Sequence, residues 1–77
     1  MDTLWLGYDG LVVPCGEVVA VLVYSTALDR LLMRSYGVLP IGVQAVVLTA
    51  SGAYLPARWP PEQLRQRWAA WRTGGSI

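Results

Sequence analysis

The chain has 77 residues, of which 55% are hydrophobic and only 14% are charged. This composition excludes an intrinsically disordered chain, because disordered chains are poor in apolar residues and rich in net charge. A chain of this length forms one small domain and buries only about 60% of its unfolded surface. We therefore expect part of its apolar surface to face a second copy of the chain.

The charged residues are six arginines and five acids, with no lysine and no histidine, for a net charge of +1. Without histidine the chain lacks the commonest general base and zinc ligand, and without lysine it has neither a Schiff base nor a P-loop. Cys15 is the single cysteine, so no internal disulfide forms and a cytoplasmic location is expected. No signal peptide is expected, since Asp2 replaces a basic start.

The N-terminal third of the chain predicts three strands. Residues 4–6 and 11–13 are short apolar segments separated by a turn with two glycines, which is typical of a hairpin. Residues 18–24 form a continuous apolar run without alternation, which predicts a strand buried on both faces, one against a helix and the other against a neighbouring subunit. This run is far shorter than the roughly 20 residues of a membrane helix.

A first helix is expected to follow this strand. Thr26 and Asp29 have the spacing of a capping box, and Gly37 is a plausible end. The residues between them place one apolar stripe on the helix, made by Leu28, Leu31, Leu32 and Tyr36.

The second half predicts a hairpin and a final helix. A loop over 38–43 leads to a fully apolar strand at 45–49, with residues 53–55 as its return strand. Pro56 is expected to end the sheet, and Pro61 to begin a helix. The apolar stripe of that helix consists of Leu64, Trp68 and Trp71. The expected order is β-β-β-α-β-β-α, an α+β fold of antiparallel strands in one domain over 1–73, with a flexible tail at 74–77.

The sequence contains no recognisable catalytic machinery. Its serines and threonines have no histidine or lysine to activate them, and Ser25 and Ser51 fit a helix start and a turn. Cys15 has no basic neighbour in sequence and is read as a packing residue. The carboxylates are scattered singly, without metal-ligand spacing. We expect no enzyme activity, no cofactor, no metal and no small-molecule substrate.

Arginine and tryptophan are concentrated in the last quarter, where Glu62 is the only acid. Basic and aromatic side chains in alternation are typical of surfaces that contact nucleic-acid backbones. An ordinary amphipathic helix with a solvated arginine face fits Arg65, Arg67 and Arg72 equally well. Trp68 and Trp71 lie on the stripe with Leu64 and are expected in the core or an interface.

Two stretches resemble the RemA/RemB family of extracellular matrix regulators, and the RemB-like branch in particular. The first combines residues 6–13, Leu-Gly-Tyr-Asp-Gly-Leu-Val-Val, with residues 17–22, Glu-Val-Val-Ala-Val-Leu. The second combines residues 44–49, Gln-Ala-Val-Val-Leu-Thr, with 53–56, Ala-Tyr-Leu-Pro, and 64–67, Leu-Arg-Gln-Arg. The resemblance covers the chain from about Leu4 to Arg67 and rests on the order and spacing of these segments.

The resemblance implies a bacterial transcriptional regulator of biofilm matrix genes that binds double-stranded DNA as a ring-shaped homo-oligomer. A ring multiplies each weak phosphate contact by its copy number. RemA-type members carry arginine before both buried strands, whereas this chain has Glu17 before the first and Gln44 before the second. Of the family's basic residues, only Arg65 and Arg67 carry over.

We therefore expect five residues to contact DNA: Arg58, Arg65, Arg67, Arg72 and, at the position of a lost arginine, Gln44. The alternative is a ring-forming structural or protein-interaction subunit that has lost DNA binding, which Glu17 and the near-neutral charge favour. A third alternative is a protein whose tryptophan-rich helix lies on a membrane surface. No membrane partner is expected.

Overall fold

The computed structural model describes residues 2–8 and 10–73. Two α-helices and five strands follow one another in the predicted order. Their bounds are β1 Thr3–Trp5, β2 Val12–Pro14, β3 Val18–Val23, α1 Asp29–Tyr36, β4 Ala45–Thr49, β5 Tyr54–Ala57 and α2 Pro61–Arg72, with 3₁₀ turns at Cys15–Glu17 and Thr26–Leu28. The α+β class and the single small domain are confirmed, and the expected tail at 74–77 lies outside the described residues.

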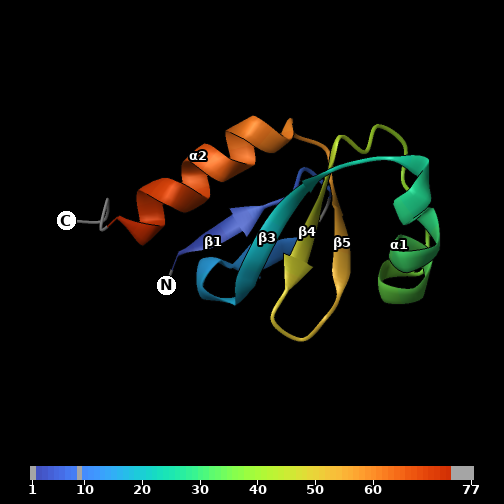
Figure 1. Ribbon diagram of the computed structural model, residues 1–77, viewed down its shortest axis with the longest axis horizontal. Helices are drawn as coiled ribbons and strands as arrows, with labels where there is room; N and C mark the ends of the chain where they lie inside the picture. The colour runs from blue at the N-terminus through green and yellow to red at the C-terminus, as the bar shows by residue number, and fades with distance from the viewer. Residues whose placement is uncertain (1, 9, 74–77) are drawn as a thin grey trace.

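The strands form two antiparallel sheets, a β1-β2 hairpin and a three-stranded sheet in the order β3-β4-β5. In Figure 1 α2 lies along the side of β1 and β3, whereas α1 stands beside β5 at the other end. The hairpin also joins the larger sheet, because the Arg58 amide donates a 2.7 Å hydrogen bond to the Leu6 carbonyl. The residues that follow β5 are thereby fixed against the end of β1.

The main core lies between the hairpin, the sheet and α2. Leu6, Val47 and Leu64 are fully buried there, one from each of these parts. Side chains alternate along a strand, so Val46 points away from Val47 to the opposite face of β4. Val46 is also fully buried, as is Leu32 of α1. The central strand β4 is therefore buried on both faces, as its apolar run predicted.

Within a single chain, residues 18–24 are buried on one face only, and the other face is the one expected to meet a neighbouring subunit. Val18 and Val21 are buried, but Val19 and Val23 are 53% and 63% exposed. β3 lies at the edge of its sheet, and a register shift between Val18 and Ala20 interrupts its alternation. The strand also ends one residue early, at Val23. An apolar run alone does not distinguish a central strand from an edge strand.

Pro56 does not end the sheet, contrary to expectation; it lies inside β5, opposite Val46. β5 is the other edge strand, where a missing N–H costs no ladder hydrogen bond. The neighbouring outward N–H, that of Tyr54, donates instead to Ser35 Oγ of α1 at 3.0 Å. Proline is therefore compatible with this edge.

The two helix starts differ from each other. No side chain caps α1, which begins at Asp29 after a 3₁₀ turn, so the predicted capping box is wrong. The Asp29 carboxylate instead accepts a hydrogen bond from the Tyr24 hydroxyl. The predicted end at Gly37 is confirmed by its left-handed φ of 95°. Pro61 begins α2 as predicted.

Within the described residues, no helix combines the length and apolar character needed to cross a bilayer.

Candidate nucleic-acid interface

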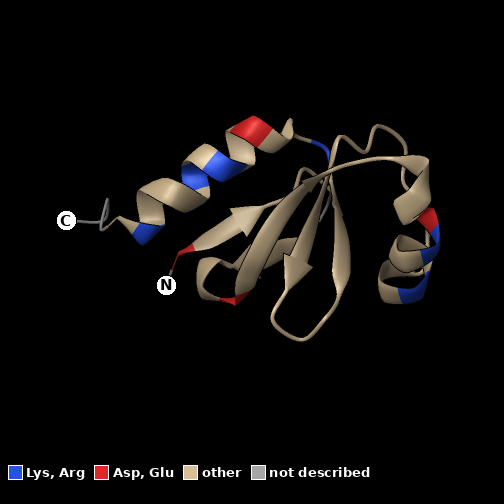
Figure 2. Cartoon of the chain, in the orientation of Figure 1, with Lys and Arg blue, Asp and Glu red and all other residues tan. Residues whose placement is uncertain are grey.

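Four of the five predicted residues are arginines in or just before α2. Arg65, Arg67 and Arg72 belong to this helix and Arg58 to the segment that enters it, and Figure 2 shows blue positions along both. All four are exposed. The helix has about 1.5 Å of rise per residue, so Arg65 and Arg72 are about 10 Å apart along its axis. The basic residues form a row along the axis but share no single face, because at about 100° per residue Arg67 lies nearly opposite Arg65 and Arg72 around the helix.

Arg58 and Gln44 lie together, a pairing that the sequence did not predict. The Gln44 side-chain amide donates to the Arg58 carbonyl at 2.7 Å, and the Gln44 backbone amide donates to the Ala57 carbonyl at 2.8 Å. The Arg58 side chain passes over Gly42, where an added Cβ would lie 3.7 Å from Nε. Gln44 thus holds the backbone of Arg58 while the guanidinium remains at the surface.

Aromatic side chains lie near Arg58 at the same end of the molecule. Trp5 and Trp59 meet edge to face with their centroids 5.6 Å apart, and Trp59 Nε1 donates to the Trp5 carbonyl at 3.1 Å. The Tyr8 hydroxyl donates to the Ile41 carbonyl at 3.0 Å. Burial and the neighbouring Tyr36 raise the pKa of Tyr8, although Arg58 opposes them. Sequence reasoning missed Trp5 and Tyr8 here, because they lie more than thirty positions from Ile41 and Trp59.

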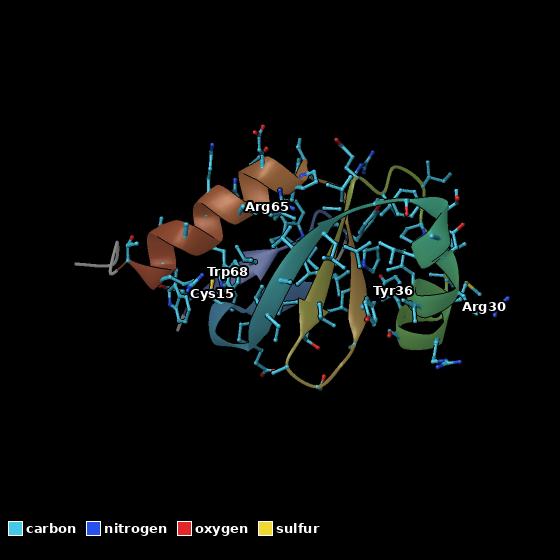
Figure 3. The ribbon with its side chains drawn as sticks, viewed as in Figure 1. Cys15, Arg30, Tyr36, Arg65 and Trp68 are labelled. Atoms are coloured by element: carbon cyan, nitrogen blue, oxygen red, sulfur yellow. The ribbon has the colours of Figure 1, made fainter. Side chains whose placement is uncertain are left out.

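Arg65 is bound to the fold. Its Nε and Nη2 both donate to the Val21 carbonyl, at 3.2 and 2.9 Å. The Tyr24 amide donates to the Gln44 carbonyl, so the backbone groups of Tyr24 point toward β4. Backbone groups alternate in direction along an edge strand, and those of Val21, three residues earlier, therefore point outward from the sheet. Figure 3 shows the Arg65 side chain between α2 and β3. This arginine joins the helix to the sheet edge and has fewer donors left for phosphate.

Arg72 also has an internal contact, since its guanidinium lies 5.0 Å from the centre of the Trp68 ring. Trp68 is partly buried against the core, as expected, and its indole Nε1 is buried without a hydrogen-bond partner among the described residues. Trp71, in contrast, is 36% exposed and is not a core residue. It lines a cavity with Arg67, near Cys15.

The structure therefore divides the predicted site into two groups. Arg65 attaches α2 to β3, and Arg72 contacts Trp68 within the same helix. Arg67 and Arg58 have exposed side chains without such a contact, and Gln44 holds the Arg58 carbonyl. Among residues 2–8 and 10–73, no group of three or more metal-ligating side chains comes together.

No family model matches the chain, and no curated protein or solved structure matches it at a significant level.

Proposed function

We propose that this chain is a homo-oligomeric, cytoplasmic DNA-binding regulator of the RemA/RemB type, a ring that contacts the phosphates of double-stranded DNA. The observation that carries the proposal is the row of exposed arginines from Arg58 along α2, which contains one acid, Glu62. A protein with a net charge of +1 binds DNA weakly as a monomer. Repetition of the row in an oligomer supplies the missing affinity through avidity.

The structure suggests which arginines contribute most. Arg67 and Arg58 have the strongest case, because Arg65 donates to Val21 and Arg72 stacks on Trp68. No helix is placed to read base edges in this proposal, so recognition rests on phosphate spacing and DNA shape. The resemblance assigns matrix genes of the biofilm as the targets.

The test is fluorescence anisotropy with a labelled duplex of about 40 base pairs at about 50 and 200 mM salt. The double variant Arg58→Ala/Arg67→Ala should bind more weakly and with a shallower salt dependence, since each lost phosphate contact removes about 0.9 from the slope. The matched control is Arg30→Ala/Arg34→Ala, which removes the same charge from α1 at the other end of the molecule (Figure 2).

An equal change of slope in both double variants would show that net charge, not this row, attracts the DNA. Absence of binding at low salt would favour the second candidate, an assembly subunit without DNA. The exposed apolar residues of the β3 edge, Val19 and Val23, favour that candidate.

A further inference from the structure

An open cavity of about 380 Å³ lies between the start of the chain and the C-terminal half of α2. Its apolar lining includes Leu4 and Cys15, each only 3% exposed, together with Ala70. Figure 3 shows Cys15 beneath this half of the helix. The volume is within the range of small-molecule sites, about 300 to 1,000 Å³.

The indole of Trp71 forms one wall of this cavity. The ring lies against the backbone of the 3₁₀ turn, since a Cβ added to Gly16 would be 3.7 Å from Trp71 Cη2. The indole contacts the turn on this side, and Trp71 is 36% exposed. A partly exposed indole is a suitable surface for stacking a flat ring.

Two side chains of opposite charge, Arg67 and Asp2, line the same cavity. The Asp2 carboxylate is close enough to the Cys15 thiol to raise its pKa, in addition to the larger effect of burial. Cys15 is therefore a protonated, unreactive part of the wall at neutral pH. The cavity contains groups for binding and no activated nucleophile.

This combination selects the chemistry of the ligand. A ligand with a single charge is attracted by one of these side chains and repelled by the other. Together with the indole, the two side chains favour a flat ring with hydrogen-bond donors on one edge and acceptors on another. Guanine has both: its N1–H and 2-amino group suit a carboxylate, and its O6 and N7 suit a guanidinium.

We propose that the cavity between Asp2, Arg67 and Trp71 binds a guanine base. The base stacks on Trp71, donates to the Asp2 carboxylate and accepts from the Arg67 guanidinium. Adenine lacks the N1–H donor, and pyrimidines cover less of the indole. The base belongs either to a free nucleotide or to an unpaired nucleotide of a single strand, because the Watson–Crick edge is needed for Asp2.

The experiment is calorimetric titration of the full chain with GMP, AMP and CMP. We expect GMP to bind tighter than AMP by about tenfold or more, the discrimination of one bidentate contact. A short single strand with one guanine, and the same strand with adenine in its place, form the second arm. Binding of the strand but not of GMP assigns the site to nucleic acid, and preference for guanine in neither arm overturns the proposal.

The sharpest variant is Asp2→Asn, because an amide changes the preferred base without removing the side chain. Asparagine accepts from N1–H and donates to a carbonyl, so the variant should lose GMP affinity about tenfold and gain affinity for xanthosine monophosphate. Glu17→Gln is the matched control, since it removes the same charge from an exposed residue outside the cavity lining. Unchanged GMP binding and no gain for the xanthine nucleotide in Asp2→Asn would overturn the role of this carboxylate.

The guanine site and the proposed duplex-binding surface are separate sites, although Arg67 belongs to both of them. Asp2→Asn and Glu17→Gln should have the same salt dependence on duplex DNA, because they carry the same charge change. Failure of guanine recognition is thereby separated from failure of the DNA-binding proposal.

Discussion

Three side chains, Cys15, Tyr8 and Tyr24, hold their protons more tightly in the folded protein than in an unfolded chain. Burial is the first cause of the raised pKa of Cys15 and Tyr8, and the hydrogen bond to Asp29 is the first cause for Tyr24. Ionised Tyr24 would face the Asp29 carboxylate with a second negative charge. Each of these groups therefore opposes its own ionisation in the native state.

The consequence is a loss of stability at alkaline pH. As pH rises through the ordinary pKa values of 9.0 for the thiol and 10.0 for the phenols, the unfolded chain releases protons before the folded one does. We expect the free energy of unfolding, measured by urea titration, to fall above about pH 9. Tyr24→Phe should make this fall shallower. A free energy that stays level through this range would contradict the prediction.

Position 7 requires glycine for two reasons, its backbone conformation and the lack of space for a side chain. Its φ is +94°, and an added Cβ would lie 2.6 Å from Arg58 Cβ and 3.2 Å from the Trp59 ring. Gly52 has a similar φ of +87°, but nothing lies within 4 Å of its added Cβ. A comparison of alanine at Gly7 and at Gly52 therefore separates the cost of the backbone conformation from the cost of the steric clash with Arg58 and Trp59.

Gly52→Ala should lose about 1 kcal/mol through its backbone alone, and Gly7→Ala at least about twice as much. The measurement is chemical denaturation of both variants, with circular dichroism to verify their folds. Equal losses of unfolding free energy in the two variants would show that Arg58 and Trp59 can move to accommodate a Cβ at Gly7 at little cost.

Local sequence signals predicted single residues well where neighbours in the chain decide the outcome. Gly37 ends α1 in the left-handed conformation, and Pro61 begins α2, as their local preferences indicate. The capping box failed because Asp29 has a competing donor, the hydroxyl of Tyr24, at the end of another element. The spacing of two residues contains no information about that hydroxyl.

At the scale of elements, the strands at 18–23 and 45–49 show the limit of prediction from patterns. Both are apolar runs, and both were correctly predicted as strands. Their different burial follows from strand order, which places β4 between two partners and β3 at an edge. Strand order depends on pairing over long sequence separations, so neither run indicates it.

The attachment of α2 to the β3 edge gives a prediction for Arg65. Arg65→Met keeps the apolar stem and removes both hydrogen bonds to the Val21 carbonyl. We expect a loss of about 1 kcal/mol, the net value of a surface-accessible hydrogen bond. Arg67→Met is the matched control on the same helix and should be close to neutral in urea denaturation. Equal stabilities of the two variants would contradict the structural role of Arg65.

The candidate site shows the same division between what is local and what is not. The sequence correctly placed Arg65, Arg67 and Arg72 on a helix, because proline, charge and apolar spacing are local. The contacts of Arg65 with Val21 and of Gln44 with Arg58 join different elements and had no signal. The cavity was equally hidden, since Asp2 and Trp71 come from opposite ends of the chain.

At the scale of the whole molecule, the exposed apolar side chains predict self-association. Trp5, Val19, Val23 and Ile41 are between 49% and 92% exposed in a chain of 8.4 kDa. Light scattering at micromolar concentration should give a multiple of this mass. Val23→Glu should reduce the mass if the β3 edge is part of the contact, whereas Met33→Glu on α1 controls for charge. A mass of one chain for the unaltered protein would remove the oligomer from the proposed function.

The two edges of the three-stranded sheet set a rule of symmetry for any such assembly. At β5, Tyr54 donates to Ser35, Pro56 has no N–H and Arg58 donates to Leu6, so this edge accepts no further strand. The β3 edge is less protected, although its Val21 carbonyl accepts from Arg65, and pairing between two identical β3 edges would be a twofold contact that closes after two copies. A ring with more members must therefore be built as a ring of dimers, or from a heterologous surface elsewhere on the domain.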